Sequence, residues 1–274
     1  LGPEFREIYK CTDGDSRGYL IYTLWGRDAI CPHCKSTFSI WDSIERQTGR
    51  MPTRLKCPAC GKESPKHGLK YTDNRPVLLS YKRENGERVE RAPTPDDVEL
   101  IRQQSEIAPA SWYPEVEIDT TREMYIRSAL HLQGVSRISD FYMPRNLRAL
   151  SRLWARIQQV DDDRIRSALT FAFTNTAWHG TRMRRFNARG GQRPLTGTLY
   201  IPQLSSEANV LEVMRNKIRQ LRSYYEALGV QDSPLPAVRL GSATKLTGIP
   251  DASIDYVFTD PPFGSTLFYA DCNL

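Results

Sequence analysis

The chain has 274 residues, of which 39% are hydrophobic and 26% are charged, so its composition is that of an average globular protein. No apolar run approaches the ~18 residues that a membrane span requires, and the first residues do not have the pattern of a secretory leader. We therefore expect a cytoplasmic protein with no membrane partner. The formal net charge of +6 is compatible with a polyanionic partner but does not require one.

The two ends of the sequence suggest an excised fragment. Residues 1–5 read LGPEF, which is typical of a protease site followed by a cloning remnant, so we leave them out of the fold prediction. The sequence stops at Asn273-Leu274 without a terminating signal. We expect the chain to be the middle piece of a longer protein.

Residues 6–92 are predicted to be small β units arranged around cysteines. Residues 18–25 are rich in aromatic and branched side chains and are typical of a strand. Residues 77–81 and 88–90 flank Asn85-Gly86, a dipeptide that accepts the positive φ angles of a type I′ turn. These features predict a hairpin after the cysteine-containing region.

Four of the six cysteines form two C-P-x-C pairs separated by 22 residues, namely Cys31, Cys34, Cys57 and Cys60. A C-x-x-C turn directs two thiolates at one point, and two such turns can close a tetrahedron around Zn²⁺. We predict a structural zinc ribbon, because four thiolates leave no open position on the metal. The alternative is two redox-active or merely buried cysteine pairs. His33 is expected to be a bystander, and contact of the ribbon with DNA is left open.

Residues 93–234 are predicted to be mostly helical. Residues 94–97 start a helix, with threonine as N-cap and proline at the first position. Apolar residues at three- and four-residue spacing predict helices over residues 147–157, 161–173 and 210–228, the last ended by Gly229. Their apolar stripes are expected to form core.

An arginine- and glycine-rich segment, residues 178–200, is predicted to be a loop with short strands. Recognition of DNA needs cations that neutralise phosphates and a few side chains that read bases. Six residues are therefore predicted DNA contacts: Arg182, Arg184, Arg185, Asn187, Arg189 and Arg193. The alternative is an exposed loop whose arginines face solvent or pair with the acidic residues 161–163.

The character of the sequence changes in residues 235–274. Residues 237–240, and more strongly 254–259, are predicted strands, and the second runs into Asp260-Pro261-Pro262-Phe263. In doubly wound α/β folds ligands lie beyond the carboxyl ends of strands. The fold class is therefore predicted as α/β: a zinc ribbon with β hairpins, a largely helical target-recognition region, and a partial Rossmann-like edge.

The side chains of this tetrapeptide suit the recognition of an exocyclic amine. The Asp260 carboxylate and the Pro261 carbonyl can accept both hydrogens of an amino group, Pro262 stiffens the loop, and Phe263 offers a face for stacking. Such acceptors stabilise the positive charge that develops on the nitrogen when it attacks a methyl group. The alternative is a tight Pro-Pro turn without function.

The chain resembles the zinc-ribbon-containing adenine-specific DNA methylases. The resemblance is carried by the cysteine pairs and by residues 145–147, 196–202, 241–244 and 255–264. It implies S-adenosylmethionine as methyl donor and double-stranded DNA as substrate. Whether a restriction or phage-defence system is a further partner is left open by the sequence. It also implies that the residues from Asp260 to Phe263 hold the target base, and aspartate at the first position favours adenine N6 over cytosine N4.

One departure from that family concerns the cofactor. These enzymes hold the methionine end of the donor in a Phe-x-Gly-x-Gly loop, and the only paired glycines here, Gly190-Gly191, lie in the arginine-rich segment. We expect the missing half outside this chain, which alone would be inactive. Two competing interpretations stay open: an RNA guanine-N2 methyltransferase, which uses a related Asp-Pro-Pro-Tyr loop, and a non-catalytic zinc-ribbon nucleic-acid-binding module.

Overall fold

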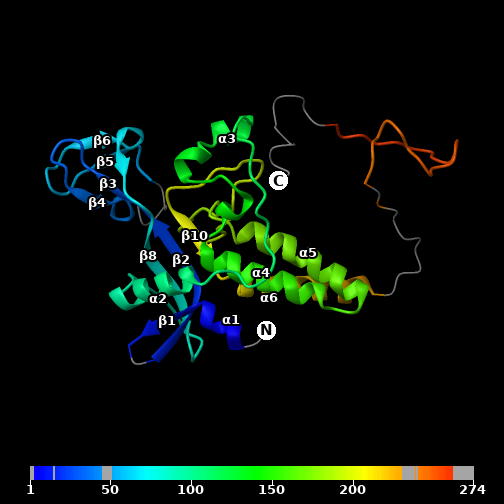
Figure 1. Ribbon diagram of the computed structural model, residues 1–274, viewed down its shortest axis with the longest axis horizontal. Coiled ribbons are helices and arrows are strands. Elements are labelled where there is room, and N and C mark those ends of the chain that lie inside the picture. The colour runs from blue at the N-terminus through cyan, green and yellow to red at the C-terminus, as the bar shows by residue number, and fades with distance from the viewer. Residues whose placement is uncertain (1–2, 15, 45–50, 230–237, 239, 262–274) are drawn as a thin grey trace.

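The computed structural model describes residues 3–14, 16–44, 51–229, 238 and 240–261 (Figure 1). Over these residues the protein is a mixed α/β structure in which every strand pairing is antiparallel. A central sheet lies between a small lobe of short strands at one end and a group of long helices at the other (Figure 1). No helix among the described residues is long and apolar enough to cross a membrane.

The central sheet is built around β2 (Ser16–Gly26), the strand predicted at residues 18–25. One edge of β2 pairs with β8 (Arg75–Arg83), which in turn pairs with β9 (Arg88–Arg91). The other edge is shared, because β1 (Lys10–Asp13) covers the first part of β2 and β10 (Ser205–Ala208) covers the second. A strand from late in the chain thus completes a sheet begun near its start.

Five helices of six or more residues pack against this sheet and one another: α1 (Pro3–Ile8), α2 (Pro95–Glu106), α4 (Pro144–Gln158), α5 (Asp163–His179) and α6 (Val210–Leu228). The four longer ones confirm the predicted helices. Thr94 and Asp97 form a capping box at the start of α2, Asp162 caps α5, and Gly229 follows α6 with a positive φ of 62°.

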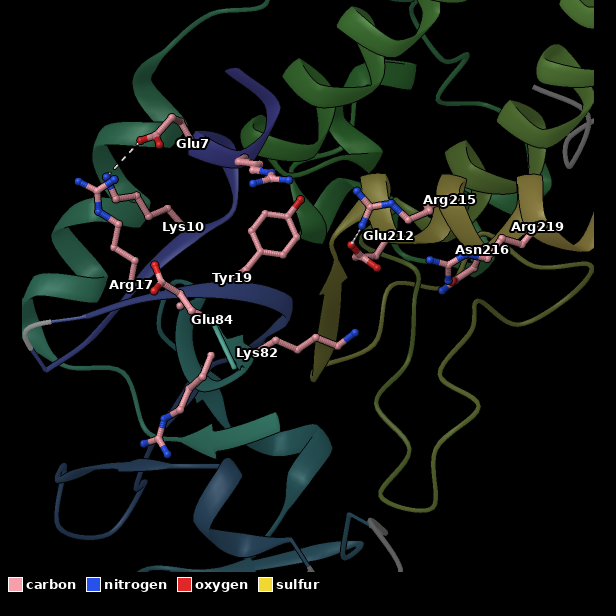
Figure 2. Close-up of a pocket in the computed structure, with 13 residues that line it drawn as sticks. Glu7, Lys10, Arg17, Tyr19, Lys82, Glu84, Glu212, Arg215, Asn216 and Arg219 are labelled. Carbon is pink, nitrogen blue, oxygen red and sulfur yellow. Dashed lines mark hydrogen bonds and ion pairs between the residues drawn. The ribbon is translucent and has the colours of Figure 1, made fainter. Parts of the chain in front are cut away.

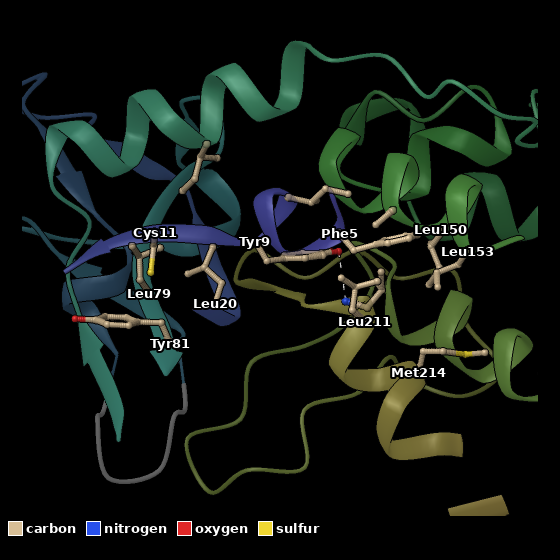
Figure 3. Close-up of a cluster of buried hydrophobic side chains, with 14 of the residues drawn as sticks. Phe5, Tyr9, Cys11, Leu20, Leu79, Tyr81, Leu150, Leu153, Leu211 and Met214 are labelled. Carbon is tan, nitrogen blue, oxygen red and sulfur yellow. Dashed lines mark hydrogen bonds between the residues drawn. The ribbon is translucent and has the colours of Figure 1, made fainter. Parts of the chain in front are cut away.

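The largest core joins the sheet to the helices (Figure 3). Leu20 and Leu79 come from β2 and β8, Leu150 from α4, and Leu211 and Met214 from α6, and all five are almost fully buried. Because this core takes residues from both sides of the predicted boundary at residues 92/93, that boundary does not separate two cores.

Phe5 corrects the treatment of residues 1–5. Its ring is 2% exposed and belongs to the same core, beside Leu150 in Figure 3. Leaving residues 1–5 out of the fold was wrong for Phe5, because α1 packs on α4 and turns the ring inward. A resemblance to a cloning remnant carries no information about packing.

The small lobe consists of two short sheets. β3 (Asp28–Ile30) lies between β4 (Thr37–Ser39) and β7 (Lys70–Tyr71), and β5 (Arg54–Lys56) pairs with β6 (Glu63–Pro65). Two short 3-10 helices complete it, η1 (Trp41–Ser43) and η2 (Lys66–Gly68). The lobe core includes Leu24 of β2 and Val77 of β8, so the lobe packs directly on the central sheet.

The predicted hairpin between β8 and β9 is confirmed, but its turn differs. Arg83 and Glu87 close a three-residue loop through the Arg83 amide, and Gly86 has a φ of 86° whereas Asn85 does not have a positive φ. A type I′ turn needs positive φ at both central residues, so the prediction was wrong. The arrangement is instead the three-residue hairpin loop with glycine in the left-handed region.

A third core lies beneath short elements that the sequence did not predict. α3 (Glu123–Arg127) is followed by the 3-10 helices η3 (Leu130–Gln133) and η4 (Ile138–Phe141). Their apolar side chains pack with Met183 and Leu199 of the arginine-rich segment. That segment is irregular and contains isolated bridges such as Arg185 with Arg193, which agrees with a loop carrying short paired stretches.

The segment of residues 240–261 forms no strand and lies apart from the rest of the protein (Figure 1). Tyr256 is 79% exposed and Phe258 is 80% exposed. The strand predicted at 254–259 is therefore not formed, and a Rossmann-like edge is not shown. A strand buried in a parallel sheet needs hydrogen-bonded neighbours, and none of the described residues pairs with this segment. Of the strand predicted at 237–240, Val238 and Leu240 are exposed and the other two residues lie outside the described ones.

Candidate functional site

The four cysteine thiols predicted to bind zinc lie together in the small lobe. Their Sγ atoms are all within 4.8 Å of one another. Two pairs, Cys31 with Cys60 and Cys34 with Cys57, are separated by 3.7 Å. A Zn–S bond of about 2.3 Å implies a spacing of about 3.8 Å between sulfurs at the corners of a tetrahedron. The cluster therefore has the composition and the size of a structural zinc site.

Two loops of the same backbone conformation present these thiols. The Cys31 amide donates to the Ser36 carbonyl at 2.9 Å, and the Lys35 amide donates to the Cys31 carbonyl at 3.0 Å. In the second loop Cys57 and Gly61 occupy the equivalent places of Cys31 and Lys35. Lys35 and Gly61 have positive φ angles of 63° and 72°, so each loop closes through a left-handed residue just after its second cysteine.

The surroundings of the cluster favour the thiolate, which is the form that binds metal, at Cys34 and Cys57. At Cys60 the backbone hydrogen bond with Lys62 lowers the pKa, but burial and the other three thiols outweigh it and raise the pKa to about 11. The Ser36 hydroxyl lies 3.2 Å from the Cys57 Sγ and 3.0 Å from the Cys34 Sγ. These contacts are the main cause that lowers the pKa of Cys57 to about 6 and also lowers the pKa of Cys34. His33 is exposed and is not part of the cluster. A metal held by four thiolates would have no open position for substrate, which is typical of a structural site.

The arginine-rich segment divides into internal and exposed side chains. Arg182 donates to the Gln133 and Asp140 carbonyls, and Arg184 donates to Ser206. Burial lowers the pKa of both, that of Arg184 to about 10. These two predicted DNA contacts are thus half-buried and hold the loop to its neighbours.

The other four predicted DNA contacts lie nearer the surface. Arg185, Arg189 and Arg193 are exposed, and Asn187 is half-buried with its Oδ1 accepting the Arg189 amide at 3.1 Å. Within the described residues none of these arginines pairs with the acidic stretch 161–163. Three arginines of the segment therefore remain positioned to meet a polyanion.

The predicted target-base loop, residues 260–263, is only partly described. Asp260 and Pro261 are exposed and lie in the segment that stands apart from the body, while Pro262 and Phe263 lie outside the described residues. The structure does not bring Asp260 together with the cysteine cluster or the arginine-rich segment. In this chain the acceptor groups are accessible but no pocket is built around them by the described residues.

A buried polar network was missed by the sequence reasoning. Arg145, 2% exposed, forms a two-point ion pair with Glu207 at 2.5 and 3.0 Å and donates to the Thr23 hydroxyl at 2.9 Å. The Trp25 indole also donates to Glu207 at 2.8 Å. Paired and hydrogen-bonded, these charges can be buried. They join α4 to β10 and β2.

The residue after Arg145 extends this network. Asn146 accepts the Tyr9 hydroxyl at 2.6 Å and donates to the Gly180 carbonyl at 2.9 Å. Burial raises the pKa of Tyr9 far above its usual value, so its hydroxyl stays protonated and can donate. The Arg145-Asn146 dipeptide thus has a structural role in the described residues. Nothing in the local sequence separates Arg145 from the other three arginines of α4, Arg148, Arg152 and Arg156, so its burial could not be read from the sequence.

No protein-family model, curated protein or solved structure matches this chain.

Proposed function

We propose that this chain belongs to an S-adenosylmethionine-dependent DNA methyltransferase that modifies an exocyclic amino group, N6 of adenine. In this proposal the chain contributes the zinc ribbon, the DNA-recognition region and the target-base loop, and the cofactor-binding half lies elsewhere in a longer enzyme. The observation that carries it is the sequence Asp260-Pro261-Pro262-Phe263 directly after the apolar residues 254–259.

The chemistry follows from the groups that the loop offers. The Asp260 carboxylate and the Pro261 carbonyl accept the two hydrogens of the target amine, which favours a pyramidal nitrogen and stabilises its developing positive charge. Phe263 stacks on the base after the base has left the duplex, a step that costs a few kcal/mol. S-adenosylmethionine, when bound, supplies the electrophilic methyl group. We assign no residue of this chain to hold it.

The exposed apolar side chains before the loop support this proposal. Tyr256, Val257 and Phe258 are each more than two-thirds exposed, and each would gain roughly 1.5–3 kcal/mol from burial. A parallel strand of a Rossmann-like sheet is a setting that buries such a run on both faces. In the full-length enzyme we expect residues 254–259 to become this strand and to place Asp260 at its carboxyl end.

The cysteine cluster supports the same proposal without defining the reaction. A structural zinc site contributes on the order of 10 kcal/mol, enough to hold a lobe with a small core. The lobe packs on the central sheet through Leu24 and Val77, so the metal also stabilises the surface next to it. We propose that the zinc ribbon positions the DNA-recognition region.

The test uses the full-length protein with its zinc retained, S-adenosylmethionine and unmethylated DNA. Mass spectrometry of the digested nucleosides should show N6-methyladenine with the wild type and none with Asp260→Ala. N4-methylcytosine would keep the mechanism and overturn the choice of base. Methylation of transfer RNA at guanine N2, with none of DNA, would replace the proposal by the RNA methyltransferase interpretation.

A second candidate function is a zinc-ribbon module that binds nucleic acid without catalysis. It is favoured by one contrast: the described residues assemble the cysteine cluster and expose the arginines, but build no pocket around Asp260. This candidate expects the full-length protein to produce no methylated nucleoside. It also expects Asp260→Ala to leave nucleic-acid binding unchanged.

A further inference from the structure

A second basic surface lies away from the arginine-rich segment, in a groove of about 740 Å³ (Figure 2). Its walls come from four parts of the chain: α1, the β1–β2 hairpin, the β8–β9 hairpin, and the first half of α6. Tyr19 of β2 lies between these walls (Figure 2), and Gly18 beside it also lines the groove. Folding therefore brings the groove together from residues that are far apart in the sequence.

The charge of the groove is strongly positive. Seven cations and three carboxylates line it. Three of the cations have carboxylate partners: Lys10 with Glu7, Arg215 with Glu212, and Arg83 with residues outside the lining. The other four are exposed and have no ion-pair partner among the described residues: Arg6, Arg17, Lys82 and Arg219.

The surface between these cations suits a chain of phosphates. Gly18 is buried between β1 and β8 and adds no side chain to the groove; a Cβ there would come within 2.5 Å of the Tyr81 Cδ2. Beside it the half-buried ring of Tyr19 points into the groove (Figure 2). Burial raises the pKa of Tyr19, so its hydroxyl remains a neutral donor. Hydroxyl and cationic groups are usual partners of phosphate oxygens in DNA.

We infer that this groove binds the phosphodiester backbone of double-stranded DNA through Arg6, Arg17, Lys82 and Arg219. A single phosphate would not engage cations on four separate structural elements, whereas a backbone presents one charge after another along the groove. DNA is the partner here as in the proposed function, but binding in the groove does not depend on methylation. It names a contact surface distinct from the arginine-rich segment.

The test measures binding of a short DNA duplex of arbitrary sequence to this chain by fluorescence anisotropy over a salt series. The groove variant is Arg17→Ala/Lys82→Ala/Arg219→Ala. A matched variant, Arg102→Ala/Arg164→Ala/Arg222→Ala, removes the same charge from exposed helix positions outside the groove. All six positions are exposed, so we expect both variants to fold, and circular dichroism verifies this.

The groove variant should bind roughly tenfold more weakly or worse at low salt. Its slope of log K against log salt should fall by about three, one for each lost phosphate contact. The matched variant should keep most of the wild-type slope. Equal slopes for the two variants would overturn the inference, and so would loss of binding in Arg189→Ala/Arg193→Ala with none in the groove variant.

DNA binding by the groove and methylation by the full-length protein can be disproved independently. If the wild-type chain does not bind duplex DNA, the groove is not a DNA site, even if the full-length protein methylates DNA. If the groove variant alone loses binding but the full-length protein makes no methylated nucleoside, the inference stands and the methyltransferase proposal fails.

Discussion

The small lobe that holds the four cysteines (the cysteine lobe) and the segment of residues 240–261 carry the two most specific motifs of the sequence. Only the motif of the cysteine lobe is assembled in the structure. Each C-P-x-C loop closes through its own backbone hydrogen bonds, and the two loops then meet at the thiols. Asp260 follows an apolar run that nothing among the described residues pairs with or covers. A motif made of local turns forms through hydrogen bonds within its own residues, whereas a motif at the end of a strand needs neighbouring strands to hold that strand in place.

The largest effect is expected from breaking the cysteine lobe. Cys57→Ala should abolish zinc binding and unfold the lobe, because three thiolates no longer enclose the metal and its core is small. Zinc content by plasma emission spectroscopy should fall from one ion per chain to none, with the lobe becoming sensitive to protease. His33→Ala is the matched control within the same loop and should retain the zinc. Retention of a full zinc equivalent by Cys57→Ala would contradict the four-thiolate site.

A smaller but still large effect should follow from opening the buried ion pair that holds β10 beside β2. Glu207→Ala leaves Arg145 buried without a carboxylate to balance its charge, and loss of one member of such a pair costs about 3–5 kcal/mol. Urea denaturation measures the change in the free energy of unfolding. The control Glu106→Ala removes an exposed carboxylate that pairs with Arg102 and should change little. If the two substitutions lowered the free energy of unfolding equally, Arg145 and Glu207 would not form a buried ion pair.

Substitutions at the two left-handed positions of the cysteine loops, Lys35 and Gly61, should change the stability of the lobe modestly and in opposite directions. Gly61→Ala should destabilise the lobe by about 1–2 kcal/mol, because only glycine adopts a positive φ without a steric penalty. No atom lies within 4 Å of the Cβ that would be added, so this effect belongs to the backbone alone. Lys35→Gly should stabilise the lobe for the same reason. The midpoint of zinc-loaded thermal unfolding measures both, and shifts of the same sign would refute the equivalence of the loops.

The smallest effect is expected in the exposed segment. Phe258→Ser should change the stability of this chain by less than about 0.5 kcal/mol, because a side chain that is 80% exposed gives up little packing. The same substitution in the full-length protein should destabilise it, if residues 254–259 form a buried strand there. Urea denaturation of both proteins makes the comparison. A large loss of stability in this chain would mean that the segment packs on the body.

The sequence predicted those parts whose determinants are close together in the chain. The helix that begins after Thr94 carries its own cap, the strand β2 its aromatic and branched side chains, and the cysteine loops their spacing, and the structure has all three. It could not predict β10 or the partner of Arg145, because the four residues of β10 show no alternation and all are buried by contact with a strand far away in the chain. The basic groove was missed for the same reason, since its cations are spread from Arg6 to Arg219.

The errors have physical causes as well. A type I′ turn was expected from Asn85-Gly86, but one additional loop residue moves the positive φ to the glycine alone. The arginine-rich segment was interpreted by charge only, although the side chains of Arg182 and Arg184 donate to backbone carbonyls and to a serine inside the protein. A count of charges does not reveal which of them the fold itself uses.

Hydrogen exchange followed by mass spectrometry, on this chain and on the full-length protein, tests most directly whether the target-base loop is completed by other strands. We predict that the cysteine loops are protected in both proteins, and that residues 254–259 exchange at once in this chain but slowly in the full-length protein. Equally rapid exchange of residues 254–259 in both would contradict it, because Asp260 would then not stand at the end of a strand.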